Sequence, residues 1–197
     1  QADHSVNGTF LATSTDLLNW KKVGILFPRA TRTHRNGVVL HDPHNRAVKV
    51  NGKFIMYIND GLVAYSDDLV HWESHETKER WPGGEGCLAL ANYSKERPED
   101  IVLFTGGNHT GHFYAIGEVL FSTRDPEKPR SWLPRPVLKA EEEYPWEIGL
   151  SAEPPHKPIS TFRDCIFFNA LTLHAGQWWL YYGGSEYYTC LATAPGA

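Results

Sequence analysis

Residues 63–72 read V-A-Y-S-D-D-L-V-H-W, and residues 11–20 read L-A-T-S-T-D-L-L-N-W. The two stretches match in kind in six columns: an aliphatic residue, Ala, Ser, Asp, Leu and Trp. A degenerate third copy, V-L-F-S-T-R-D-P, begins at Val119 and closes at Trp132, and the opening of a fourth, L-A-T-A-P, begins at Leu191. Ser and Asp bond nearby backbone amides, so each copy predicts a polar turn whose Leu and Trp fold back over a sheet.

A pair of strands precedes two of these copies. The segment A-V-K-V (47–50) is followed by N-G-K-F-I-M-Y-I, and A-L-T-L (170–173) is followed by A-G-Q-W-W-L-Y-Y. In both pairs a glycine, Gly52 or Gly176, stands where a tight hairpin turn is expected. Each unit therefore predicts four antiparallel strands in roughly 40 to 60 residues, which is the pattern of a propeller blade.

The repeat predicts an all-β chain that forms a single, partial β-propeller domain of about three and a half four-stranded blades. No helix of convincing length is expected, and residues 139–144 are interpreted as a connection between blades. A closed ring removes exposed sheet edges, so we expect a missing segment or a second chain to complete it. The expected blades are residues 1–23 (the end of one blade), 38–75, 84–133 and 160–197.

The composition excludes several classes of partner. Apolar residues make up 41% and charged residues 21%, and the net charge is -4 without a block of Lys or Arg. Binding to nucleic acid is therefore not expected. The apolar runs have the length of strands, so membrane insertion is not expected either. The chain opens with Gln1 and shows no signal peptide, and we expect that an upstream segment has been lost.

Three N-x-[ST] sequons, at Asn7, Asn92 and Asn108, indicate a glycoprotein of the extracellular space or secretory pathway, unless they are accidental. The three cysteines are too few for a disulfide scaffold and lack the spacing of metal ligands. No cofactor or metal is predicted. A bridge between Cys165 and Cys190 is conceivable in an oxidising compartment.

The A-x-S-x-D-L-x-x-W element resembles the outer blade turn of the five-bladed propeller glycosidases (glycoside hydrolase families 32, 43 and 130, which are invertase-like, arabinanase-like and β-mannoside phosphorylase-like). The run from Asp125 to Glu147, C-I-F-F-N-A-L (165–171) and W-W-L-Y-Y-G-G-S-E (178–186) resemble the β-mannoside phosphorylase and β-1,2-mannosidase family most. The resemblance implies a five-bladed propeller, a carbohydrate partner and cleavage of a glycosidic bond.

Glycosidic cleavage generally needs a proton donor and a second carboxylate. Inner strands line the funnel of a propeller, so acids that start an inner strand are the catalytic candidates: Asp42, Glu85 and Asp164. By resemblance to invertase-like and arabinanase-like enzymes, Asp42 would orient the substrate and tune the acid, and Glu85 would donate the proton. In the mannoside family, Asp42 matches a substrate-contacting Asp and the general acid lies in a preceding blade.

The substrate-binding candidates lie beside these acids or carry aromatic rings that could stack on sugars. Glu186 stands where the mannoside family has Asp. A phosphorylase would need an anion site of Arg, Lys and His, and the family's tyrosine-histidine-glycine element is not recognisable between residues 106 and 114. Hydrolysis is therefore expected rather than phosphorolysis. The candidates are Glu186, Arg163, His41, Trp81 and Tyr187.

The sequence departs from the family pattern in two places and leaves other functions open. The segment that would carry the family's essential first-blade Asp is absent, and Glu85 precedes Gly-Cys instead of Gly-Pro. The alternative for each acid is a structural role: Asp42 starts a turn, Glu85 lies in solvent and Asp164 pairs with Arg163. The alternative function is a non-catalytic carbohydrate-binding or structural propeller module of a larger extracellular assembly.

Overall fold

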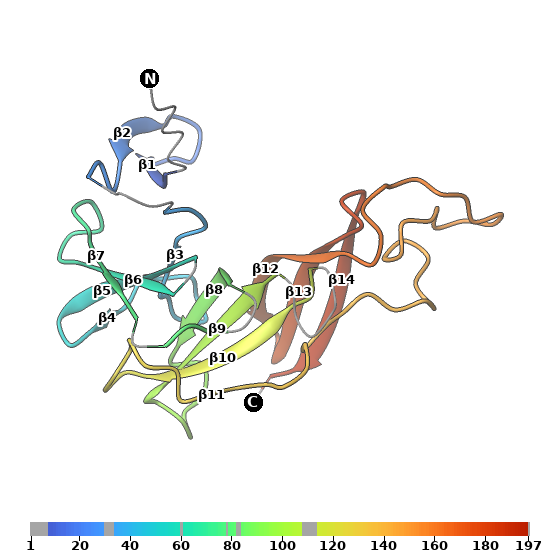
Figure 1. Cartoon of the computed structure of the whole chain (residues 1–197). Helices are drawn as coiled ribbons and strands as arrows, with labels where there is room; N and C mark the ends of the chain where they lie inside the picture. The colour runs from blue at the N-terminus through green and yellow to red at the C-terminus, as the bar shows by residue number, and fades with distance from the viewer. Residues whose placement is uncertain are drawn as a thin grey trace.

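The computed structural model describes residues 8–29, 34–59, 61–77, 79–81, 84–107 and 114–196. Across these ranges the chain is all-β: it forms four antiparallel sheets and no helix. Figure 1 shows the sheets following one another along the molecule in chain order, from the hairpin near the N-terminus to the sheet that carries the C-terminus.

Each sheet is built from strands that are consecutive in the sequence, as expected of propeller blades. The first sheet holds β1 (Phe10–Thr13) and β2 (Lys21–Ile25). The second holds β3 (Val38–Val39), β4 (Lys49–Val50), β5 (Lys53–Ile58), β6 (Leu62–Ser66) and β7 (Glu73–Glu76). The third holds β8 (Glu85–Ala91), β9 (Asp100–Gly106), β10 (Gly117–Ser122) and β11 (Ser131–Trp132). The fourth holds β12 (Ile166–His174), β13 (Gln177–Gly184) and β14 (Tyr188–Pro195).

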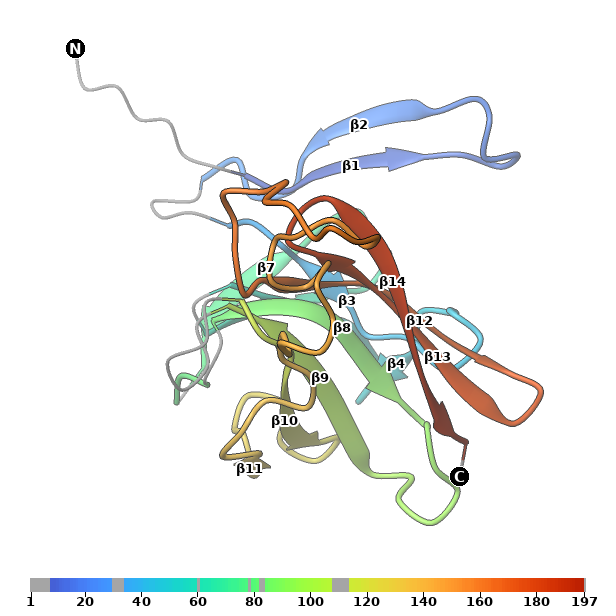
Figure 2. The same ribbon diagram turned by 90° about the vertical axis from the view of Figure 1, so that its right-hand side faces the viewer.

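The first strands of neighbouring sheets lie next to each other. β8 contacts both β3 and β12, as Figure 2 also shows. Backbone hydrogen bonds join the second sheet to the third: His41 N–H donates to Ala89 O (3.1 Å), and Ala91 N–H donates to His41 O (2.9 Å). His41 and Leu90 form a parallel bridge, so the inner strands of these two sheets run in the same direction.

Three apolar cores hold neighbouring sheets together. Tyr57, Trp81 and Phe121 lie in the core between the second and third sheets. Phe168 and Tyr182 lie in the core between the third and fourth sheets. The second, third and fourth sheets thus bury apolar side chains against a neighbouring sheet, and burial of one large side chain stabilises the fold by about 1.5–3 kcal/mol.

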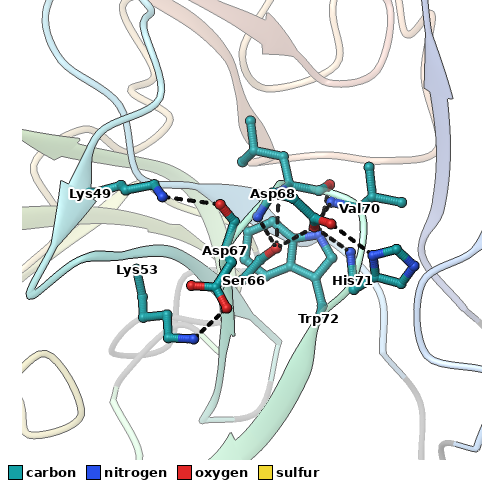
Figure 3. Close-up of polar contacts among 9 residues, drawn as sticks. Lys49, Lys53, Ser66, Asp67, Asp68, Val70, His71 and Trp72 are labelled. Carbon is teal, nitrogen blue, oxygen red and sulfur yellow. Dashed lines mark hydrogen bonds and ion pairs between the residues drawn. The ribbon is translucent and has the colours of Figure 1, made fainter.

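The S-x-D-L-x-x-W turn of the second sheet has the structure expected from its sequence (Figure 3). The Ser66 hydroxyl accepts the backbone N–H groups of Asp68 and Leu69 and donates to Asp68 Oδ1. The Asp68 carboxylate accepts the N–H groups of Val70 and His71. Trp72 donates its indole N–H to Leu69 O and is 8% exposed. The turn therefore satisfies its own polar groups while its tryptophan covers the blade.

The first copy of the turn makes the same polar contacts without burying its apolar residues. Ser14 and Asp16 bond the N–H groups of Leu17 and Asn19, yet Leu17 is 75% and Trp20 is 57% exposed. In the described part of the chain, β1 and β2 pair only with each other. A two-stranded sheet offers too little apolar surface for these side chains to cover.

The two expected hairpin turns are confirmed, with both central residues at positive φ. Asn51 has φ 52° and Gly52 φ 83°, and Ala175 has φ 50° and Gly176 φ 74°. A Cβ atom at either glycine would meet nothing within 4 Å. A side chain would therefore fit at both positions. Glycine is favoured there because the turn needs a positive φ, a conformation that suits the twist of the flanking strands.

One expectation about the second sheet is wrong in detail. His41-Asp42-Pro43 was expected to open the inner strand, but β3 begins at Val38 and ends before His41. Asp42 Oδ1 accepts the N–H groups of His44 and Arg46. These bonds close a local turn that interrupts the inner strand between β3 and β4.

Candidate functional site

An ion pair joins the starts of two inner strands. Glu85 is the first residue of β8, and Arg35 lies three residues before β3. Arg35 Nη2 and Glu85 Oε1 are 2.8 Å apart, and the Glu85 side chain is 16% exposed. Arg35 N–H also donates to the side chain of Asn59, which is buried. Glu85 is therefore a sheltered carboxylate whose charged partner comes from the preceding blade.

Phe167, on β12 of the fourth sheet, lies close to the cross-strand partner of Glu85. Glu85 pairs across the sheet with Gly106 at the end of β9. A Cβ atom on Gly106 would lie 3.2 Å from the Phe167 ring and 2.9 Å from Cys87 Sγ. The Phe167 ring also packs edge-on against Tyr114, at 5.8 Å between centroids. Glycine at position 106 thus lets β12 approach β8 and β9 closely.

A pocket of about 330 Å³ opens beside Phe167 on the fourth sheet. Glu186 and Tyr187, in the turn between β13 and β14, line it together with Asn169. Tyr187 is 64% exposed and packs edge-on against Tyr188. This pocket combines aromatic rings, an amide and a carboxylate, which suits a ligand with both ring faces and hydroxyl groups.

The turn that carries Glu186 is held by hydrogen bonds to Cys165 and Glu147. Ser185 is fully buried: its N–H donates to Cys165 O (2.7 Å), and its hydroxyl donates to Glu147 O (2.6 Å). Ser185 and Glu186 both have positive φ, at 48° and 55°. These contacts hold two non-glycine residues in the left-handed region, a strain that is found most often at functional sites.

Asp42 and His41 are engaged in contacts of their own. Burial acts to raise the pKa of Asp42, but hydrogen bonds from Arg46 and His44 outweigh it and lower that pKa. Arg46 also forms an ion pair with the Asp42 carboxylate at 2.8 Å. His41 Nδ1 lies 2.8 Å from Asp42 O. In this structure the Asp42 carboxylate faces its own turn and its ion-pair partner.

The remaining predicted residues are distributed between core and surface. Trp81 is 5% exposed and packs edge-on against Tyr57 and Phe121, so its faces are covered by core residues. Asp164 and Arg163 are exposed just before β12, and Asp164 has φ 54°.

Of the three sequons, Asn92 is exposed at the end of β8, with φ 55°. Asn7 and Asn108 lie outside the described residues.

The cysteines are free thiols, so the conceivable Cys165–Cys190 bridge is not present. Burial raises the pKa of Cys87 to about 12 and that of Cys165 to about 11, which keeps both protonated near neutral pH. Among the described residues, no group of three or more His, Cys, Asp or Glu side chains could hold a metal ion. The same residues include no helix long and apolar enough to cross a membrane.

A large hollow at the outer rim lies away from the inner strands. It has a volume of about 1020 Å³ and runs between β2 and the S-x-D-L-x-x-W turn at the outer rim, where Ile25, Asp68 and Trp72 line it. The polar groups of that turn bond one another. We therefore place the candidate site at the inner-strand starts, where a sheltered carboxylate, an arginine and aromatic rings meet.

Sequence reasoning missed Arg35, Phe167 and Glu147. Arg35 precedes Asn36-Gly37 and an apolar run, a turn-to-strand signal that would have placed the strand start at Val38. Phe167 alternates with Ile166 and Phe168 along a strand, and its exposed side could have been read from that alternation. No local signal shows that Glu147 is buried.

Comparison with protein-family models finds none that matches, and comparison with the curated proteins also finds no match. Solved structures do match. A glycosyl hydrolase from Bacteroides ovatus has a TM-score of 0.73 at 23% identity, covering 98% of this chain and 59% of that one. A structure from work on the GH130 family of mannoside phosphorylases, which contains glycoside hydrolases that target β-1,2 mannosidic linkages in Candida mannan, has a TM-score of 0.70 at 19% identity, covering 98% and 61%. The β-1,2-mannobiose phosphorylase of Listeria innocua, in complex with β-1,2-mannobiose, has a TM-score of 0.66 at 18% identity, covering 94% and 50%.

Fold and comparisons together show that this chain has the fold of part of a β-propeller. This confirms the expected class, an all-β chain that forms part of a five-bladed ring. Within that class, the chain shares its fold with glycosyl hydrolases and with mannoside phosphorylases, and it spans between half and about three fifths of their length.

Proposed function

We propose that the protein is a glycoside hydrolase-like protein that acts on an oligosaccharide or glycan at the inner-strand starts, with Glu85 as its central carboxylate. The observation that carries the proposal is the Arg35–Glu85 ion pair, which joins two neighbouring inner strands at 2.8 Å. Phe167 and the adjoining pocket with Glu186 and Tyr187 add a ring-stacking surface and hydroxyl-binding groups.

The proposed reaction is hydrolysis. A protonated carboxyl gives its proton to the leaving glycosidic oxygen as the bond to the anomeric carbon breaks, and a second carboxylate takes a proton from the attacking water. Glu85 is the proposed proton donor and Asp164 the proposed second carboxylate, with Glu186 binding sugar hydroxyls. In the structure Glu85 forms an ion pair with Arg35, so the reaction requires that Arg35 turns away and that Glu85 takes up a proton from water before it donates one to the glycosidic oxygen. The Arg35 side chain is 52% exposed and has room to turn away.

The test is turnover of β-1,2-mannobiose by the full-length protein, with and without inorganic phosphate, followed by NMR of the products. We expect free mannose in both conditions, and a loss of about 10²-fold or more in Glu85→Gln, because general acid catalysis contributes that much. Thr105→Ser serves as the matched control on the neighbouring strand β9. Turnover unchanged in Glu85→Gln would contradict the role of Glu85, and a mannosyl phosphate product would contradict hydrolysis.

A second candidate function is carbohydrate binding without catalysis. It is supported by the positions of the other candidate acids, which lie in contacts of their own or in solvent. The Asp42 carboxylate is engaged by Arg46 and its own turn, and Asp164 and Glu186 are exposed. Among the described residues, Glu85 has an arginine as its side-chain partner and no hydrogen bond to a second carboxylate. Binding of mannobiose without turnover, lost in Tyr187→Ala, would support this function over hydrolysis.

We also propose that a further sheet of the same propeller, from a missing segment or a second chain, covers the outer face of the fourth sheet. Tyr181 and Leu191, which pair across β13 and β14, are 38% and 45% exposed there, while the opposite face packs on the third sheet. The intact mass of the protein from its source tests this. A mass well above 22.3 kDa, or a stable dimer, supports it, and a monomer of that mass contradicts it.

An extracellular or secretory location is proposed from the sequons. Asn92 is exposed in the structure and open to modification. A fall in mass after enzymatic removal of N-linked glycans, abolished in part by Asn92→Gln, would support the proposal. An unchanged mass would contradict it.

A further inference from the structure

A second pocket lies at the outer edge of the fourth sheet, on the other side of the Ser185–Tyr187 turn. It has a volume of about 460 Å³ and is enclosed by the connecting loop before β12 and by β14. The loop is seated closely on the sheet, because a Cβ atom on Gly184 would lie 3.1 Å from Trp146 O. The pocket therefore has a fixed wall, and its volume falls in the range of small-molecule sites.

A buried carboxylate forms the back of this pocket. Glu147 is 2% exposed; its Oε1 accepts the Tyr182 hydroxyl at 2.5 Å and its Oε2 accepts the Glu141 N–H at 3.0 Å. Each carboxylate oxygen has a further lone pair for a ligand hydroxyl. These two bonds, together with the bond from Ser185 to Glu147 O, hold the group in one orientation.

Donors without a protein acceptor line the same pocket. The Tyr188 hydroxyl accepts the Ala152 N–H at 3.2 Å. Within the described part of the chain, neither its own proton nor the indole N–H of Trp146 reaches a protein acceptor. Trp146 and Tyr144 lie against each other with ring centroids 5.4 Å apart, and both line the pocket. The wall thus combines aromatic faces with unused donors and carboxylate acceptors.

The charge of the pocket selects against anions. Glu141 and Glu147 line it with Lys139 as the one cationic side chain among its lining residues. A ligand with its own negative charge would be repelled, whereas a neutral ligand rich in hydroxyl groups meets both donors and acceptors.

We propose that this pocket is a second binding site for a neutral sugar ring, stacked on Trp146 and hydrogen-bonded by Tyr188 and Glu147. The site is independent of the reaction proposed at Glu85. An alternative occupant is an extended protein strand, because β14 pairs only with β13 in the described chain. The sugar is favoured because a strand would need the backbone edge of β14, whereas the free donors and the buried carboxylate are side-chain groups.

The experiment is fluorine NMR of the full-length protein labelled with 5-fluorotryptophan, in which the Trp146 signal is assigned from Trp146→Phe. Titration with β-1,2-mannobiose should move this signal, in Glu85→Gln as well as in the unmodified protein. Mannose 6-phosphate should move it far less. Tyr188→Phe, which keeps the ring, should lower the affinity for the sugar about three- to tenfold, because one hydrogen bond is lost. Tyr181→Phe, whose ring does not line this pocket, should leave the response of the Trp146 signal unchanged.

Four results would overturn the proposal. The first is a Trp146 signal that stays in place up to the solubility limit of the sugar. The second is an equal response to mannose 6-phosphate, because the acidic wall should reject it. The third is a response to a β-strand peptide but not to the sugar, which would assign the pocket to strand pairing on β14. The fourth is loss of the response in Glu85→Gln, which would show instead that the sugar binds only at the proposed reaction site.

Discussion

At the scale of single residues, the hydroxyl of one serine organises each S-x-D-L-x-x-W turn. Ser66 is 2% exposed and bonds Asp68 and Leu69, whereas Ser14 makes the equivalent bonds in the open first copy. We expect Ser66→Ala to lower the free energy of unfolding by about 1 kcal/mol or more, because the part-buried N–H groups of Asp68 and Leu69 lose their acceptor. Ser14→Ala should cost less, since water replaces its hydroxyl. Urea unfolding measures both, and equal losses would contradict the role of burial.

The aspartates of these turns give the fold a dependence on pH. Hydrogen bonds from His71 and Val70 lower the pKa of Asp68 well below its ordinary value. A group whose pKa is lower in the folded state contributes stability above its unfolded pKa and loses it as pH falls through the folded pKa. Stability should therefore decrease below about pH 4.

Asp68→Asn provides the check, because it keeps an acceptor oxygen and removes the charge. Urea unfolding between pH 2 and pH 6 should show a shallower loss of stability in this variant than in the unmodified protein. Val70→Ala, which leaves the carboxylate and the backbone N–H in place, is the control. A slope unchanged by Asp68→Asn would show that other groups carry the dependence on pH.

At the scale of elements, the tryptophan of the repeated turn should contribute differently to the free energy of unfolding in its two copies. Trp72 is 8% exposed and packs with Ile58 and Leu62, and Trp20 is 57% exposed. Trp72→Ala should destabilise the protein by about 3–5 kcal/mol, the usual cost of a large cavity. Trp20→Ala should change stability by less than about 1 kcal/mol. Thermal unfolding compares them, and a similar cost for both would mean that the first copy is covered in solution.

At the scale of the whole molecule, the approach of the fourth sheet to the third depends on Gly106. Gly106→Ala would press against Phe167 and Cys87, and overpacking of this kind costs about 1–3 kcal/mol. Gly183→Ala is a matched control on β13, because its Cβ atom would meet its neighbours at ordinary distances of 3.9 Å or more. Thermal midpoints should fall in the first variant and stay close to the unmodified protein in the second. Equal midpoints would show that Phe167 moves aside without cost.

The sequence by itself determined the blade pattern. Ser, Asp, Leu and Trp at fixed spacing define a turn through bonds between near neighbours, as Ser66 and Asp68 show. Asn51-Gly52 and Ala175-Gly176 define hairpins through their own φ values. These features are local, so the sequence of a few residues is enough to predict them.

Only the tertiary structure decided which acids and rings meet. Glu85 and Arg35 are 50 residues apart in the chain, and Gly106 meets Phe167 across two sheets. Asp42 looked like an acid at the start of an inner strand, but the N–H groups of His44 and Arg46 draw it into a turn. Burial of Glu147 depends on a loop folding over a distant strand. Contacts between blades arise from the packing of whole sheets, and no local pattern of residues encodes them.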